Sequence, residues 1–130
     1  MEIFGEKWMR KYMQEWNKEP GLTKELGIIK FNSIIAYGFI NEESPRAVIQ
    51  VCKGKVVSAG DYDDEAVNWD LRADPDRWHE WISHPPGMMA LGMAYSSRAL
   101  KFMSGDYASM IKDPRMAVPF IKSFDVMGRV

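Results

Sequence analysis

The sequence predicts an α+β fold: a five-stranded, mainly antiparallel sheet covered on one face by helices. Two observations predict it. Between residues 31 and 73, four short apolar or alternating segments are separated by turn residues, as in consecutive strands. Helix-like apolar repeats lie on both sides of them, with a fifth strand-like segment over 99–104. The predicted order is a helix, four strands, two helices, a strand and two helices, in one domain spanning 1–130.

The N-terminal segment predicts an amphipathic helix. Phe4, Trp8, Tyr12 and Trp16 recur at every fourth position, with charged residues opposite. Pro20 breaks this helix, and one further turn is predicted over 23–26. Two tryptophans on one face predict that this face is covered.

Three strands are predicted next, over 31–40, 47–52 and 56–60. The first is aromatic and β-branched on both faces, so its pattern leaves open which face meets the helices. Lys53-Gly54-Lys55 predicts a tight hairpin between the second and third strands, since glycine adopts positive φ readily.

The fourth strand, over 67–73, has the clearest alternation in the chain. Val67, Trp69, Leu71 and Ala73 point one way, and Asn68, Asp70 and Arg72 point the other. We expect the first set to face the helices and the second to face solvent. The short turns between the four strands predict an antiparallel meander.

The remaining elements are three helices before the last one and a short strand among them. Asp74-Pro75 begins a helix that ends before Pro85, because proline suits the first helical position. A helix over 87–97, the strand over 99–104 and a short helix over 107–112 follow.

The last helix begins at Asp113-Pro114 and carries an apolar stripe. Met116, Phe120, Phe124 and Met127 recur at helical spacing. Pro119 predicts that the helix kinks or restarts.

The bulk properties exclude several classes of protein. A net charge of −1 gives no general attraction to nucleic acid, and no apolar run approaches the ~20 residues of a membrane span. The acidic N-terminal residues do not predict a signal peptide. The single cysteine, Cys52, excludes an internal disulfide and fits the cytoplasm; we expect it to be a small buried hydrophobe.

No motif predicts catalysis or a metal site. His79 and His84 are five residues apart, so they do not share the helix face that metal ligation needs. The acidic turn 61–65 lacks the glycine and glutamate of a calcium loop, with Ala66 and Arg72 at those positions. No cofactor and no enzymatic activity are predicted.

The chain is rich in methionine: it has ten, seven of them between Met88 and Met127. Methionine is flexible and polarizable, so it fills gaps in cores and lines adaptable binding surfaces. Both interpretations, core filler and an adaptable wall around an apolar ligand, are open from the sequence.

Three stretches, in order, resemble the sterol carrier protein type 2 family. They are Lys53–Val57, Trp69–Arg72 and Leu100–Asp106, the last resembling the family's strand that ends in Gly-Asp. The resemblance covers the chain from Trp8 to about Phe124. The final Gly128-Arg129-Val130 is not a peroxisomal signal, so the chain looks more like the short, stand-alone prokaryotic members.

This resemblance implies an apolar tunnel between the sheet and the helices, closed in part by the last helix. It implies non-enzymatic carriage of a fatty acid, fatty acyl thioester, phospholipid, isoprenoid or sterol in the cytoplasm, and is compatible with transient membrane contact and a homodimer. The tunnel is expected to be lined by Trp8, Tyr12, Ile35, Tyr37, Trp69, Leu71, Met89, Met93, Leu100, Phe102, Met110, Met116, Phe120 and Phe124.

Two alternatives belong to other classes. The first is an accessory or regulatory domain that binds a partner protein through its Met/Phe-rich C-terminal face. The second is an enzyme acting on an apolar substrate, for which no pair of nucleophile and base can be named.

Overall fold

The computed structural model describes all 130 residues and contains one five-stranded sheet with six helices. The strands are β1 (Ser33–Phe39), β2 (Ala47–Cys52), β3 (Lys55–Asp61), β4 (Trp69–Ala73) and β5 (Lys101–Ser104). The helices are α1 (Glu6–Asn17), α2 (Pro20–Ile28), α3 (Pro75–Ser83), α4 (Met88–Ser96), α5 (Tyr107–Ile111) and α6 (Pro114–Met127). The α+β class predicted from the sequence is confirmed, and so is the order of elements, except that a second helix, α2, precedes the strands where a single turn was predicted.

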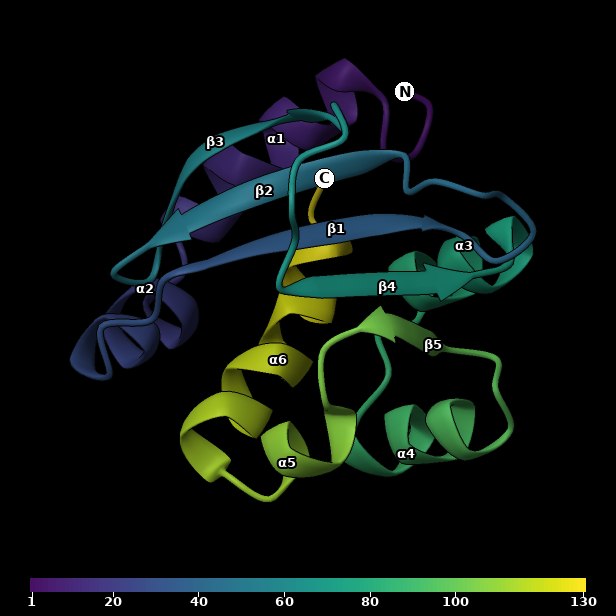
Figure 1. Cartoon of the computed structure of the whole chain (residues 1–130). Coiled ribbons are helices and arrows are strands. Elements are labelled where there is room, and N and C mark those ends of the chain that lie inside the picture. The colour runs from purple at the N-terminus through teal and green to yellow at the C-terminus, as the bar shows by residue number, and fades with distance from the viewer.

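The sheet is mixed, with the strand order β3-β2-β1-β4-β5 (Figure 1). All neighbouring pairs are antiparallel except β1 and β4, which are parallel. The predicted four-strand meander is therefore wrong at its last step, because β4 pairs with β1 and not with β3. The connection over 62–68 crosses in front of β2 and β1, on the face away from α1 (Figure 1). Its seven residues easily span the three strand spacings, of ~4.8 Å each, between β3 and β4.

The aromatic stripe of α1 packs on the sheet. Trp8, Tyr12 and Trp16 are buried, as predicted. On β1 it is Tyr37 that faces them, with ring centroids 5.8 Å from Tyr12, while Ala36 lies on the opposite face of the strand. The sequence left open which face of β1 meets the helices; in the structure it is the face that carries Ile35, Tyr37 and Phe39.

The polar face of β4 differs from the prediction. Asp70 and Arg72 are buried, with exposed fractions of 7% and 2%, although solvent exposure was expected. The Arg72 guanidinium donates to both Asp70 carboxylate oxygens, at 2.6 and 3.0 Å, and to the Glu42 carbonyl at 2.8 Å. The β1–β2 connection folds over this face, so the two charges are buried but satisfy one another.

Three local expectations are also corrected. Pro20 begins α2, which runs to Ile28 and is longer than the single predicted turn, because proline fits the first position of a helix. Pro119 lies within α6, which continues from Pro114 to Met127 without a restart. Cys52 is exposed, because β2 buries Ala47, Ile49 and Val51 and turns its last residue to the other face. No helix has the length and apolar character to cross a membrane.

Candidate functional site

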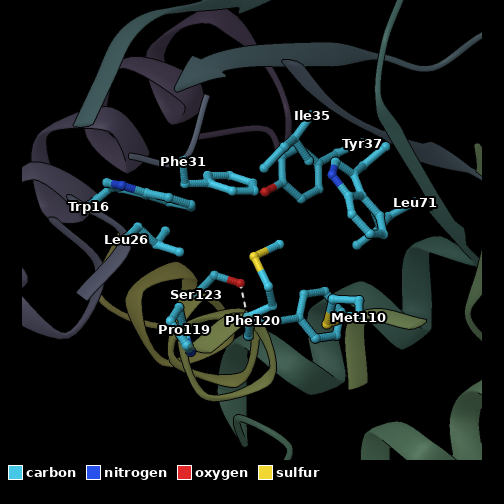
Figure 2. Close-up of a pocket in the computed structure, with 12 residues that line it drawn as sticks. Trp16, Leu26, Phe31, Ile35, Tyr37, Leu71, Met110, Pro119, Phe120 and Ser123 are labelled. Atoms are coloured by element: carbon cyan, nitrogen blue, oxygen red, sulfur yellow. Dashed lines mark hydrogen bonds between the residues drawn. The ribbon is translucent and has the colours of Figure 1, made fainter. Parts of the chain in front are cut away.

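An apolar cavity lies between α6 and the central strands β1 and β4 (Figure 2). Its volume is about 50 Å³. It is lined by Trp16, Leu26, Phe31, Ile35, Tyr37, Trp69, Leu71, Met110, Met116, Pro119, Phe120 and Ser123. These residues come from α1, α2, β1, β4, α5 and α6, except Phe31, which lies two positions before β1.

The sheet side of the cavity is built by the one parallel strand pair. In this register Ile35 of β1 lies opposite Trp69 of β4, and Tyr37 lies opposite Leu71. Residues directly opposite and two positions apart share one face of a sheet. The parallel pairing of β4 with β1 therefore places four large side chains side by side under the helices.

The helix side of the cavity is built mainly by α6. Met116, Pro119, Phe120 and Ser123 are spaced by three and four residues, so they lie on one face of the helix. Asp113 caps this helix, its carboxylate accepting from the Arg115 backbone N–H at 3.0 Å. The Asp-Pro start predicted from the sequence thus fixes where this face points.

The Gly105-Asp106 turn supports the wall at two points. Gly105 has a φ of +97°, and a Cβ there would lie 2.8 Å from Cζ3 of Trp69, so only glycine leaves room for the indole. Asp106 caps α5 through Ser109, accepting from its hydroxyl at 2.6 Å, and these hydrogen bonds lower the pKa of Asp106. The turn therefore positions both Trp69 and the helix that carries Met110.

The residues that line the cavity differ in their exposure to solvent. Trp16, Leu26, Tyr37, Leu71 and Ser123 are buried. By contrast, Ile35, Trp69, Met116 and Phe120 are half-buried. A molecule that enters the cavity from solvent would therefore contact half-buried residues on its way in.

The lining includes two hydroxyl groups, those of Tyr37 and Ser123, while the indole N–H of Trp16 donates to the Gly54 carbonyl at 3.0 Å. The Tyr37 hydroxyl lies 3.1 Å from that of Tyr12, and the Ser123 hydroxyl donates to the Phe120 carbonyl at 2.6 Å (Figure 2). Burial raises the pKa of both tyrosines well above about 10, so both are neutral at physiological pH. None of the lining residues carries a formal charge.

The structure brings together part of the predicted tunnel lining. The predicted residues that line the cavity are Ile35, Tyr37, Trp69, Leu71, Met110, Met116 and Phe120. Trp8, Tyr12, Leu100 and Phe124 are instead buried in the hydrophobic core. Phe102 packs behind the lining, its ring 5.9 Å from that of Phe120.

Met89 and Met93 lie away from the cavity, contrary to the predicted lining. Their exposed fractions are 80% and 66%, because α4 turns Leu91 and Ala94 towards the core. The sequence could not show which side of α4 is exposed, because the helix is almost wholly apolar and has no polar face to mark that side.

Five lining residues were missed by the sequence reasoning: Trp16, Leu26, Phe31, Pro119 and Ser123. Helical spacing from Met116 and Phe120 was a usable signal for Pro119 and Ser123. The α1 stripe likewise contains Trp16. Nothing in the sequence marks Leu26, which reaches the cavity only because α2 packs beside α6.

The Met/Phe-rich face of α6 is not available as the predicted partner-binding surface. Phe124 is fully buried, stacked on Trp78 at 6.2 Å and edge-on to Trp81 at 5.7 Å. Met127 is buried as well. The alternative of a partner-binding C-terminal face therefore has no support in the structure.

Histidine, cysteine and carboxylate side chains form no group of three or more that could hold a metal ion. His79 and His84 are both exposed on and beside α3.

Comparison with solved structures identifies the fold. A crystal structure of sterol carrier protein 2 superposes with a TM-score of 0.78 over 99% of both chains, at 18% sequence identity. The chain has the fold of sterol carrier protein 2. A solution structure of a conserved hypothetical protein from Thermus thermophilus matches with a TM-score of 0.69 at 19% identity, over 99% of this chain and 90% of that one. The ubiquinone synthesis protein UbiJ-SCP2 matches at 0.56 and 9% identity, over 90% and 84%.

Sequence comparison alone finds no such relation: no family model and no curated protein matches the chain. The resemblance inferred from three short stretches is therefore confirmed by the shared SCP2-like fold.

Proposed function

We propose that this protein binds and carries a lipid-like apolar molecule in the cavity between α6 and the β1–β4 pair, without transforming it. The observation that carries the proposal is the uncharged, aromatic and aliphatic lining drawn from both layers of the fold. Sterol carrier protein 2, named for the carriage of sterols, shares this fold. The candidate ligands are a fatty acid, fatty acyl thioester, phospholipid, isoprenoid or sterol.

The cavity is too small to hold a lipid as it stands, so the proposal requires its walls to move. A volume of about 50 Å³ is far below the ~300 Å³ at the small end of ligand pockets. Met110 and Met116 have three rotatable bonds each and can vacate space at low cost. Ligand entry in this account displaces these side chains and Phe120, and opens the tunnel that the sequence resemblance implied.

The moving part is α5 with the first half of α6. The second half of α6 is fixed in the core by Phe124, Val126 and Met127. Transfer of about ten methylenes from water supplies roughly 8 kcal/mol, which has to offset both this opening and the loss of the ligand's freedom.

The exposed methionines of α4 offer a route by which lipid could be exchanged between a membrane and the cavity. Met88, Met89 and Met93 project into solvent, and Tyr95 of the same helix stacks on Tyr107 of α5 at 4.1 Å. Transient contact of α4 with a membrane would therefore bring lipid beside the moving part. We place this activity in the cytoplasm, where a single exposed thiol such as Cys52 stays reduced.

A displacement assay with a matched pair of variants tests the function. Purified protein is stripped of lipid, the extract is analysed by mass spectrometry, and a fluorescent fatty-chain probe is titrated and displaced. Met116→Glu places a carboxylate among the apolar residues that line the cavity, and we expect it to weaken probe binding more than about tenfold. Val118→Glu, on the exposed side of the same helix at 56% exposure, is the control and should bind normally.

Two results would contradict the proposal. One is the absence of both extracted lipid and probe binding at micromolar protein. The other is equal probe binding by the two variants while both remain folded, because the probe would then occupy another surface.

A further inference from the structure

Helix α4 turns an apolar face to solvent. Met89 and Met93 lie one turn apart and are 80% and 66% exposed, and Met88 beside them is 48% exposed. The helix contains no charged residue, and only Leu91 and Ala94 are buried. It lies at the margin of the molecule near β5 and α5, and is the helix least tied to the other elements (Figure 1). Nothing in this chain covers the face, which is typical of a surface that contacts a partner.

The charges next to this face are positive. The chain contains no aspartate or glutamate from residue 81 to 105, while Arg98 and Lys101 follow directly after α4 and are exposed. Every arginine of the chain except Arg98 forms an ion pair with a carboxylate. A hollow in the surface is lined by both cations together with Tyr95 and Met103. The apolar face of α4 therefore has a basic margin whose charges are available to an anion.

These features favour an anionic lipid bilayer over the other possible partners. Flexible apolar side chains enter the interface of a bilayer, and neighbouring cations contact the lipid phosphates. A second copy of this chain, packed on the same face, would bring Arg98 and Lys101 against their own copies with no acid of this stretch to offset them. The acidic side chains beside the face are Glu80, paired with Arg77 at 3.3 Å, and Asp106, which caps α5.

The same face is connected to the cavity wall through aromatic contacts. Tyr95 of α4 stacks on Tyr107 of α5 at 4.1 Å and meets the Phe102 ring edge-on at 5.9 Å. Phe102 in turn lies 5.9 Å from Phe120, which lines the cavity. Tyr107 begins α5, the helix that carries Met110. Displacement of α4 therefore removes support from both parts of the wall that a ligand has to move.

We propose that the α4–β5 surface docks on an anionic lipid bilayer and that docking opens the cavity. This surface is defined by Met89, Met93, Tyr95, Arg98, Lys101 and Met103. The methionines enter the interface, the two cations contact lipid phosphates, and Tyr95 leaves Tyr107 so that α5 and the first half of α6 move. The inference rests on the proposed function: it keeps the same cavity and names the charge of the membrane and the event that opens the cavity.

Sedimentation with vesicles tests the docking step. Vesicles of phosphatidylcholine are compared with vesicles in which about one third of the lipid is phosphatidylglycerol. Each cation at an anionic surface contributes about fivefold in affinity, so we expect binding to the anionic vesicles to be at least about tenfold tighter at low salt. High salt should remove this difference, because it screens exposed charges.

Matched variants locate the surface. Arg98 has a φ of +65°, which glycine adopts without strain, so Arg98→Gly with Lys101→Gln removes two charges from a stable fold. We expect this variant to bind anionic vesicles about tenfold more weakly and neutral vesicles as before. Lys53→Gln with Lys55→Gln is the control. It also removes two exposed charges, on the β2–β3 hairpin beside α2 and away from α4, and should bind like wild type (Figure 1).

The rate of probe transfer tests the opening step. Protein loaded with the fluorescent fatty-chain probe is mixed with vesicles that carry a quencher. Because docking opens the cavity, the transfer rate should rise with the concentration of anionic vesicles. In Arg98→Gly with Lys101→Gln this rise should be lost, while probe affinity in vesicle-free solution stays that of wild type.

Three results would overturn the inference and leave the carrier function standing, provided that the probe binds in vesicle-free solution. The first is equal wild-type binding to both kinds of vesicle, and the second is an equal loss of binding in the hairpin control. The third is a transfer rate that does not depend on vesicle concentration, because the ligand would then leave through water. A dimer that Met89→Ser with Met93→Ser dissociates, without vesicle binding, would assign the surface to a second copy. Absence of probe binding itself would contradict the proposed function.

Discussion

Replacing Gly105 by alanine tests how the wall of the cavity is held. The added Cβ would lie under 3 Å from Cζ3 and Cδ2 of Trp69, and the residue would keep a φ of +97° that L residues rarely adopt. The backbone strain costs about 1–2 kcal/mol and the forced repacking about 1–3 kcal/mol. Gly105→Ala should therefore lower the free energy of unfolding by about 2–5 kcal/mol.

Urea unfolding followed by tryptophan fluorescence measures this change. With a slope of ~1.5 kcal/mol per molar urea, a loss of ~3 kcal/mol moves the midpoint down by about 2 M. Gly60→Ala is the matched control in the same sheet, because a Cβ there meets nothing within 4 Å. It should stay within ~1 kcal/mol of wild type. A Gly105→Ala midpoint equal to that of the control would refute the close packing of Trp69 on this turn.

Three further predictions concern the buried polar groups and the core. Asp70→Ala leaves a buried guanidinium without its carboxylate, so urea unfolding should show a loss of about 3–5 kcal/mol; a loss under ~1 kcal/mol would mean that the pair is solvated. Phe124→Ala removes a core ring and should lower the free energy of unfolding by about 3–5 kcal/mol, while the folded variant keeps its ligand affinity. A residue of a mobile lid would show the opposite pattern, with weaker ligand binding and little loss of stability. Burial raises the pKa of Tyr12 and Tyr37 above about 10, so the unfolded chain loses these protons first. Stability should therefore be fully present below about pH 10 and fall above it, with a shallower fall in Tyr12→Phe, when unfolding is measured across that range.

The sequence was sufficient for most elements because their signals are local. The α1 stripe, the Asp113 cap and the Lys53-Gly54-Lys55 hairpin each depend on residues a few positions apart. The Gly105-Asp106 turn was also a reliable local signal, since its glycine leaves room for Trp69 and its aspartate starts α5. These features were predicted because propensity, spacing and capping agree at each of them.

The errors arise where tertiary contacts decide. Alternation in β4 correctly separated Leu71 from Asp70, but the exposure of Asp70 depends on a loop folded over it from elsewhere in the chain. Strand pairing failed for the same reason, since the 62–68 connection carries no signal for which neighbour β4 joins. On α4, with almost no polar residue, periodicity could not tell the exposed Met93 from the buried Leu91.

The most direct test of the central claim uses the methionines themselves. Protein labelled with ¹³C at the methionine methyl groups is titrated with 1-dodecanol, and each resonance is assigned by single substitution to leucine. Met110 and Met116 line the cavity, while Met89 and Met93 are exposed on α4. Ligand in the cavity should shift the Met110 and Met116 resonances saturably and leave Met89 and Met93 almost unchanged. Shifts confined to Met89 and Met93, with Met110 and Met116 unmoved at saturation, would contradict the account.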